Sequence, residues 1–138
     1  LLLETTTSCV SPFIQKAGIE ALLGSQEPII DMVQKFRVRR ENIVSGLNSL
    51  KGISCLSPKG AFYVFPNITQ TGWTSETFAD VMLSDAGVAL APGPIFGQHA
   101  EGFVRLCYAN SIEYTNKAIE KMRPVLEKRM ATRTVNAS

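Results

Sequence analysis

The chain has 138 residues, the usual size of one domain and enough to enclose a single core. Lysine and arginine together number 14 and the acidic residues number 12, so no strong field favours nucleic acid or a membrane surface as a partner. The 3 cysteines lack zinc-site spacing and are odd in number, which argues against a disulfide framework and fits a cytoplasmic location. No apolar run approaches the roughly 20 residues that span a bilayer.

The two ends of the chain differ from its middle. The first residues, Leu1-Leu2-Leu3, are apolar and include no methionine, and we interpret this start as a position inside a longer protein. Residues 131–138 are small and polar and have lost apolar periodicity, so we predict a disordered tail there.

The first half of the chain has helical spacing. Residues 13–23 place apolar side chains close to the helical repeat, and Gly24 follows them as an expected helix end. Between Pro28 and Leu50, apolar residues recur at intervals of three, four or seven. This pattern predicts one long amphipathic helix.

The second half predicts short strands and two further helices. The strands are expected over residues 53–57, 61–65, 88–91 and 103–108. Thr74 and Ser111 are the expected N-caps of the helices, and Gly87 should follow the end of the first. The order of elements indicates a two-layer α/β domain, in which helices cover a short mixed sheet and the long helix precedes it.

Arg105 is a lone cation in the apolar strand 103–108. Strand alternation places it on one face with Phe103 and Cys107, opposite Val104 and Leu106. A desolvated guanidinium is costly unless it is paired, so Arg105 reaches water, pairs with an internal carboxylate or receives an anionic ligand. The residues alone favour the two structural explanations, contact with water or an internal ion pair. The ligand explanation gains from the planar guanidinium, which matches a carboxylate through two parallel hydrogen bonds.

The remaining candidates for chemistry are weak. The loop 92–102 has no phosphate-binding spacing and is either a rigid connection or a loop that approaches a ligand or a second domain. His99 lies in this loop among polar neighbours, and we interpret it as a solvated side chain without an assigned role. No serine or cysteine has an identifiable base partner, and histidines are too few for a typical metal site. We therefore expect no catalytic residue and no metal ligand in this chain.

Three ordered motifs resemble the C-terminal part of class I/II aminotransferases. They are Pro58-Lys59-Gly60-Ala61-Phe62-Tyr63, Ala86-Gly87-Val88-Ala89-Leu90-Ala91-Pro92-Gly93 and Val104-Arg105-Leu106-Cys107-Tyr108-Ala109. The similarity extends from about Thr5 to Leu126. It implies the small domain of a fold-type I pyridoxal-phosphate enzyme over residues 25–130, preceded over residues 1–24 by a remnant of the large domain and the interdomain connection.

The resemblance also implies roles for individual residues. In that family the arginine of the R-L-x-Y-A motif holds the substrate α-carboxylate, which assigns this role to Arg105. The aromatic residue of the G-A-F motif lines the substrate side of the pocket, which points to Phe62. The lysine that bears pyridoxal 5'-phosphate precedes this domain in the family, so no cofactor-binding residue is expected here. Family dimers bring a Thr-Ser segment near the other subunit, so a homodimer is expected, with Ser8 and Cys9 facing the partner.

The expected function follows from this resemblance. The parent protein would transfer an amino group between an amino acid and a 2-oxo acid in the cytoplasm, and this chain alone would be inactive. Two alternatives stay open at this point: a lyase or synthase of the same fold, and a non-enzymatic interaction or regulatory domain with an aminotransferase-like fold. The substrate's side chain is not assigned.

Overall fold

A computed structural model describes residues 5–6 and 9–136, which fall into two units, Leu1–Gln34 and Lys35–Ser138. The first unit contains helix α2 (Pro12–Leu23) and the beginning of helix α3 (Glu27–Asn48). Helix α2 ends where the sequence predicts, because the Gly24 N–H donates to the Glu20 carbonyl at 2.8 Å. None of the α2 side chains is buried within its unit.

The second unit contains a three-stranded sheet in the order β1-β3-β2. Its strands are β1 (Tyr63–Val64), β2 (Ala91–Pro92) and β3 (Val104–Cys107). The α/β fold class is confirmed, but the prediction of a mixed sheet is wrong because both neighbours pair antiparallel with β3. Strands β1 and β2 run the same way, yet β3 lies between them, so no parallel pair forms.

The predicted strand over residues 53–57 is reduced to an isolated bridge between Ser54 and Asn67. The side chain of Asn48 occupies the neighbouring backbone groups. Its Oδ1 accepts from the Cys55 N–H at 2.8 Å, and its Nδ2 donates to the Cys55 carbonyl at 2.9 Å. A side-chain amide thus replaces the partner strand that the pattern of residues 53–57 suggested.

The later helices begin at the predicted caps. The Thr74 hydroxyl accepts from the Thr77 N–H at 3.2 Å at the start of α4 (Ser75–Ala86), which Gly87 ends with a φ of 64°. The Ser111 hydroxyl accepts from the Tyr114 N–H at 3.2 Å at the start of α5 (Ile112–Asn136). Short 3-10 helices lie at Thr69–Thr71 (η1), Gly93–Phe96 (η2) and Gln98–Ala100 (η3).

Residues 131–136 of the tail predicted over residues 131–138 belong to helix α5, and the disorder itself stays a prediction. Helix α5 continues through them to Asn136, because no glycine or proline follows Pro124 to end it. The Thr132 hydroxyl also donates to the Lys128 carbonyl at 3.0 Å, within the helix. Residues 137–138 lie outside the described part of the chain.

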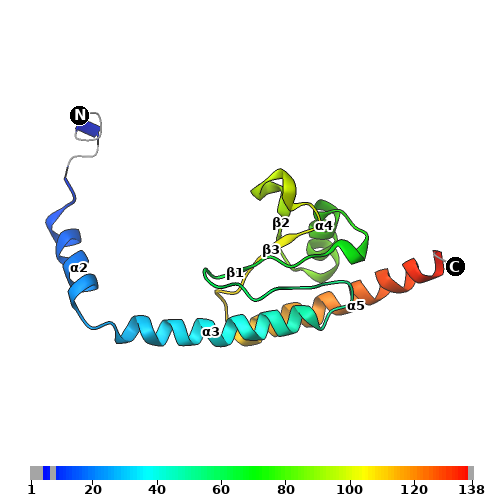
Figure 1. The fold of residues 1–138 in the computed structure, drawn as a ribbon, viewed down its shortest axis with the longest axis horizontal. Coiled ribbons are helices and arrows are strands. Elements are labelled where there is room, and N and C mark those ends of the chain that lie inside the picture. Colours follow the sequence, from blue (N-terminus) through cyan, green and yellow to red (C-terminus); the bar gives the residue numbers. More distant parts are fainter. Residues whose placement is uncertain (1–4, 7–8, 137–138) are drawn as a thin grey trace. The chain divides into compact units, whose positions relative to one another are not determined.

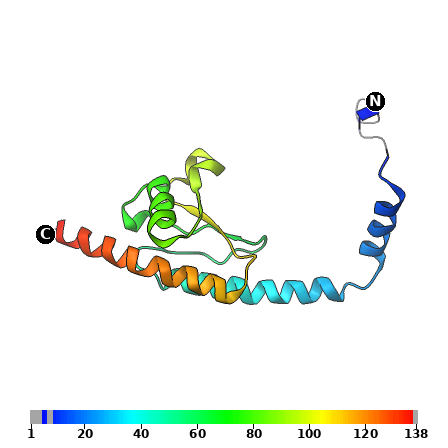
Figure 2. The same cartoon turned by 180° about the vertical axis from the view of Figure 1, so that it is seen from behind.

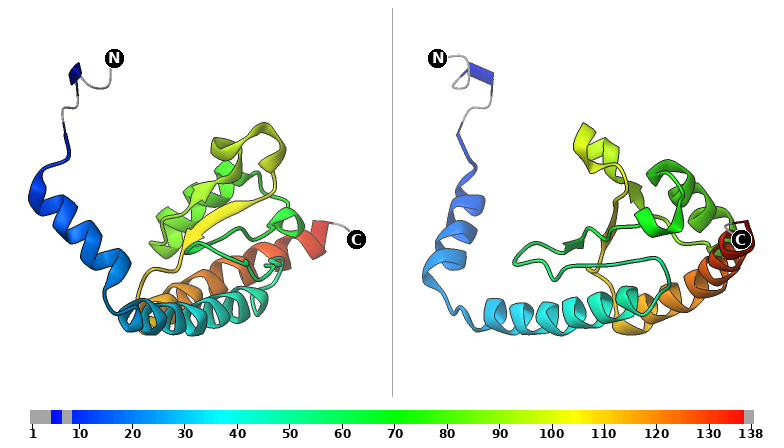
Figure 3. Two further views of the ribbon diagram at one scale, coloured as in Figure 1. Left: turned by 60° about the vertical axis from the view of Figure 1, so that its left-hand side comes forward. Right: turned by 45° about the vertical axis from the view of Figure 1, so that its right-hand side comes forward.

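The core of the second unit lies between one face of the sheet and three helices. The C-terminal half of α3 and helix α5 lie side by side (Figures 1 and 2), joined by a 2.8 Å hydrogen bond between Asn42 and Asn116. The turned views in Figure 3 show the same helix pair from other sides. The buried side chains include Ile43, Leu47, Val64, Phe78, Met82, Val104, Leu106, Tyr108, Ile119, Met122 and Leu126.

Across the described residues, no helix combines the length and the apolar character needed to cross a membrane.

Candidate functional site

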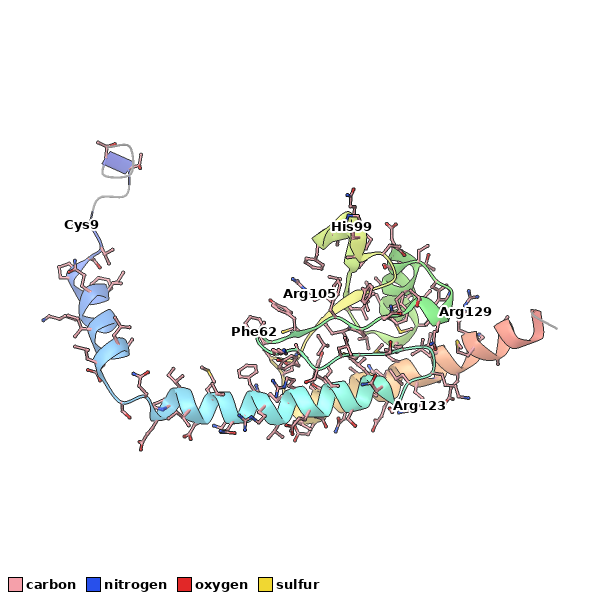
Figure 4. The ribbon with its side chains drawn as sticks, viewed as in Figure 1. Cys9, Phe62, His99, Arg105, Arg123 and Arg129 are labelled. Carbon is pink, nitrogen blue, oxygen red and sulfur yellow. The ribbon has the colours of Figure 1, made fainter. Side chains whose placement is uncertain are left out.

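Arg105 lies on the face of the sheet that points away from the core. Its strand neighbours Val104 and Leu106 are buried, whereas Arg105 is half-buried and Cys107 is exposed. The predicted alternation of the strand is therefore confirmed. Figure 4 shows Arg105 at β3, between the loop that carries His99 and the turn that carries Phe62.

Two aromatic rings hold the Arg105 guanidinium. Its central carbon Cζ lies 4.4 Å from the centroid of the Tyr63 ring and 4.1 Å from that of Phe96. Such cation–π contacts are each of the order of 0.5–2 kcal/mol, depending on desolvation. Within the described part of the chain, the guanidinium has no hydrogen bond or ion pair. The internal carboxylate that the sequence left open as a partner is therefore not found there.

The open face around Arg105 is aromatic. The register pairs Tyr63 with Cys107, which brings Tyr63 onto the face that Arg105 occupies. Phe65 stacks on Phe103 with centroids 5.4 Å apart, and the Phe96 ring meets Phe65 edge-on at 6.2 Å. These rings exclude part of the water around the guanidinium, and a lower local dielectric strengthens its electrostatic attraction to an anion.

The loop that supplies Phe96 is fixed at both ends. The Gly93 N–H donates to the Phe103 carbonyl at 2.8 Å, and a Cβ at Gly93 would collide with the Ala100 carbonyl. At the other end, the Glu101 carboxylate accepts from the Ser75 N–H at 2.9 Å, and the Ser75 hydroxyl accepts from the Gly102 N–H at 2.9 Å. The loop 92–102 is thus a tightly anchored connection that also brings an aromatic ring to Arg105.

Phe62 lies at the edge of the same aromatic surface. Its side chain is 43 % exposed, and its ring centroid is 4.5 Å from that of Tyr63. The preceding Ala61 has a left-handed φ of 59°, and the Tyr108 hydroxyl donates to its carbonyl at 2.8 Å. The Tyr108 N–H donates to the Phe62 carbonyl at 2.9 Å. Phe62 is therefore held next to a ring that contacts Arg105, without itself being one of the two cation–π partners.

The sequence did not identify Tyr63 and Phe96 as site residues. Tyr63 could have been found from strand alternation once the register between β1 and β3 was known. Phe96 has no comparable signal, because its position depends on how the loop 92–102 folds.

The sequence also singled out His99, Cys9 and Ser8. His99 is exposed in η3, with its Nε2 3.3 Å from the Gln98 amide nitrogen, and keeps no assigned role. Cys9 is exposed in the first unit, and Ser8 lies outside the described residues. In the described residues, no group of histidine, cysteine or acidic side chains could hold a metal ion.

The described residues do not form a site for pyridoxal phosphate. A lysine that carries a carbonyl cofactor is usually desolvated or lies beside another cation. Every lysine of the chain, from Lys16 to Lys128, is exposed, and none is joined to Arg105 or its two rings by a hydrogen bond. We therefore derive no chemical step through this cofactor from the residues of this chain.

Comparison with known proteins gives the family. The model of the family "Aminotransferase class I and II" matches residues 4–122, most of the chain. The chain belongs to this family. Aminotransferases of this class depend on pyridoxal phosphate in general.

Curated aminotransferases resemble the chain over most of its length. An aspartate aminotransferase of Pyrococcus horikoshii is 42% identical over 120 residues, 86% of this chain and 31% of that protein. A probable N-acetyl-LL-diaminopimelate aminotransferase of Bacillus subtilis is 38% identical over 96% of this chain and 34% of its own length. The chain thus spans about a third of the length of these relatives.

The fold also agrees with solved aminotransferases. The crystal structure of an aromatic aminotransferase from Pyrococcus horikoshii superposes with a TM-score of 0.86 and 38% identity, over 92% of this chain and 34% of that one. The aspartate aminotransferase of Rhizobium meliloti gives a TM-score of 0.86 at 32% identity, over 91% of this chain and 34% of its own. The named substrates differ among these proteins, so similarity alone fixes no side-chain specificity for this one.

Proposed function

We propose that the full-length protein containing this chain is a pyridoxal-phosphate-dependent aminotransferase that transfers an amino group between an amino acid and a 2-oxo acid. In this proposal Arg105 binds the α-carboxylate of the substrate, and Phe62 lines the pocket beside it. The single observation that carries the proposal is the Arg105 guanidinium, which lies between Tyr63 and Phe96 and has no anionic partner among the described residues.

The geometry of Arg105 is compatible with a carboxylate ligand. Aromatic rings contact the flat faces of a guanidinium, whereas a carboxylate accepts hydrogen bonds from the N–H groups at its edge. The contacts to Tyr63 and Phe96 can therefore orient the side chain without occupying the groups that would bind substrate. A partly buried cation held in this way attracts an anion more strongly than one in water.

Cofactor binding and the amino-group transfer itself require side chains that we do not find in the described residues. When bound, pyridoxal phosphate supplies the electron sink that makes amino-group transfer possible. We propose that the remainder of the full-length protein holds it, that the protein is a cytoplasmic homodimer, and that Cys9 lies toward the partner subunit. The chain alone should then show no transaminase activity when the cofactor is added.

Replacing Arg105 in the full-length enzyme tests the role. The R105L variant removes the charge at similar volume, and kcat/KM for the amino acid should fall by an amount equivalent to about 2–5 kcal/mol. The R105K variant keeps the charge but loses the two-pronged geometry, and it should recover only part of this loss. Unchanged kcat/KM in R105L would show that Arg105 does not bind substrate.

A matched control is available on α3. Arg37 carries the same charge and is exposed, and among the described residues no hydrogen bond or ring contact joins it to Arg105, Tyr63 or Phe96. The R37L variant should keep kcat/KM within about twofold of the parent, which corresponds to less than 0.5 kcal/mol. Product analysis with the same samples identifies the reaction: formation of a 2-oxo acid coupled to amination of a second one is transamination, whereas release of ammonia indicates a lyase.

A further inference from the structure

We infer that the second unit contains a separate binding cleft for a small organic anion with an apolar body. The cleft has a volume of about 420 Å³ and opens where the end of α4, the end of β3 and the first half of α5 meet. This size falls in the range of small-molecule sites, roughly 300–1,000 Å³. The inference does not rest on the proposed transaminase function, since none of the residues that hold Arg105 lines this cleft.

The floor of the cleft is apolar. Side chains from three elements and the segment after α4 contribute to it, including Ile43, Val88, Leu106, Ile119 and Met122. All five belong to the buried core, so the floor is fixed by packing and does not need to form when a ligand arrives. These side chains are at most 8 % exposed, so a hydrocarbon body over them covers a small apolar surface, at about 25 cal/mol per Å² buried.

One wall is an interrupted sheet edge. The recorded ladder between β2 and β3 consists of the pairs Ala91–Arg105 and Pro92–Val104. Two residues further along the same register, Ala89 would face Cys107, and both residues line the cleft. Among the described residues, no backbone hydrogen bond joins Ala89 to Cys107. The Tyr108 N–H points toward β1, where it donates to the Phe62 carbonyl, so the alternation of an antiparallel strand turns the Cys107 backbone groups toward Ala89. Polar backbone groups are thus available at the mouth of the cleft.

The rim is cationic. Lys117 and Lys121, one turn apart on α5, both line the cleft, and no aspartate or glutamate does. Within the part of the chain that the structure describes, no ion pair or hydrogen bond engages either ammonium group. The Lys121 Nζ lies 3.8 Å from the position that a Cβ on Gly87 would take, close to the C-terminal end of α4. The negative end of the α4 dipole explains the position of Lys121, but it does not explain a second cation, Lys117, at the same rim.

These features together select the class of ligand. Two cations in a cleft whose lining includes no acidic side chain favour an anion, and the apolar floor favours a carbon body over a bare phosphate or sulfate. A carboxylate on a medium-length or branched hydrocarbon has both properties. It would place its head group between Lys117 and Lys121, near the amide of Asn110, and its body over Leu106.

Octanoate is a suitable probe, with octanol as the uncharged control of the same chain length. Titration of the ¹⁵N-labelled chain with octanoate should shift the amide signals of Ala89, Cys107 and Asn110, and calorimetry should give saturable one-site binding. The K117Q/K121Q variant should weaken octanoate binding about tenfold, as expected for loss of charge-assisted hydrogen bonds. The K128Q variant removes the same charge from α5 outside the cleft and should bind as the parent does.

A steric variant tests the location independently of charge. Ala89 is exposed at the mouth of the cleft, so A89W can fill the opening without disturbing the core, and circular dichroism checks that it folds. The site is supported if A89W loses octanoate binding and if K117Q/K121Q binds octanoate more weakly while K128Q binds it as the parent does. Equal affinity for octanol, equal weakening in K128Q, or unchanged binding in A89W would overturn it.

Discussion

Gly93 provides a sharp test of how the loop 92–102 is held. A Cβ at this position would collide with the Ala100 carbonyl oxygen and lie 2.7 Å from the Phe103 carbonyl oxygen. Both obstacles are backbone atoms, so no side chain can move aside. The G93A variant must therefore displace the loop, which strains or breaks the 2.8 Å hydrogen bond from Gly93 to Phe103.

The magnitude follows from two terms. Overpacking costs about 1–3 kcal/mol, and the weakened hydrogen bond adds about 0.5–1.5 kcal/mol, so the free energy of unfolding should fall by about 2–4 kcal/mol. Urea unfolding followed by circular dichroism measures this change. The G60A variant is the matched control, because nothing lies within 4 Å of a Cβ at Gly60, and its stability should stay within about 0.5 kcal/mol. Equal stability of G93A and the parent would refute the close packing of the loop.

Four further predictions concern the turn before β1 and the cysteines. The A61G variant should raise the free energy of unfolding by up to about 1 kcal/mol, because relief of the left-handed φ of 59° exceeds the entropic cost of glycine; an A61G variant less stable than the parent would contradict the strain. The Y108F variant should lose about 0.5–1.5 kcal/mol with the hydroxyl bond to the Ala61 carbonyl, measured by urea unfolding. Burial raises the pKa of the Cys55 thiol from 9.0 to about 11, so stability should decline as pH rises from 9 toward 11, and a C55A variant should show less of this decline. Iodoacetamide should label exposed Cys107 much faster than Cys55, as mass spectrometry of digested protein would show.

The sequence predicts those parts of the fold that depend on near neighbours. Thr74, Gly87 and Ser111 act as caps where their types suggest, because a cap is decided within one turn of helix. The alternation of β3 is also local, and it correctly separated buried Leu106 from half-buried Arg105.

The parts that were mispredicted depend on distant residues. The pattern of residues 53–57 gives no hint that Asn48 binds the Cys55 backbone from the end of α3. Whether the sheet is mixed or antiparallel depends on which strand enters between the other two, and short apolar segments do not determine that.

The candidate site also has residues that the sequence predicts and residues that it does not. Strand alternation and the R-L-x-Y-A resemblance both single out Arg105, and neither identifies the rings that hold it. Tyr63 reaches Arg105 through the register between β1 and β3, and Phe96 through a loop fixed by Glu101 and Ser75. Conformations of this kind are set by tertiary hydrogen bonds, which lie beyond sequence patterning.

The central claim is that Arg105 binds the substrate's α-carboxylate, and a double-mutant cycle between enzyme and ligand tests it most directly. The affinity of the full-length protein would be measured for an amino acid and for its amide, which lacks the carboxylate charge, in both the parent and R105L. If the two groups interact, removing the charge from the ligand should cost about 2–5 kcal/mol in the parent and almost nothing in R105L. Equal losses in the two proteins would show that the carboxylate is bound elsewhere and would contradict the assignment.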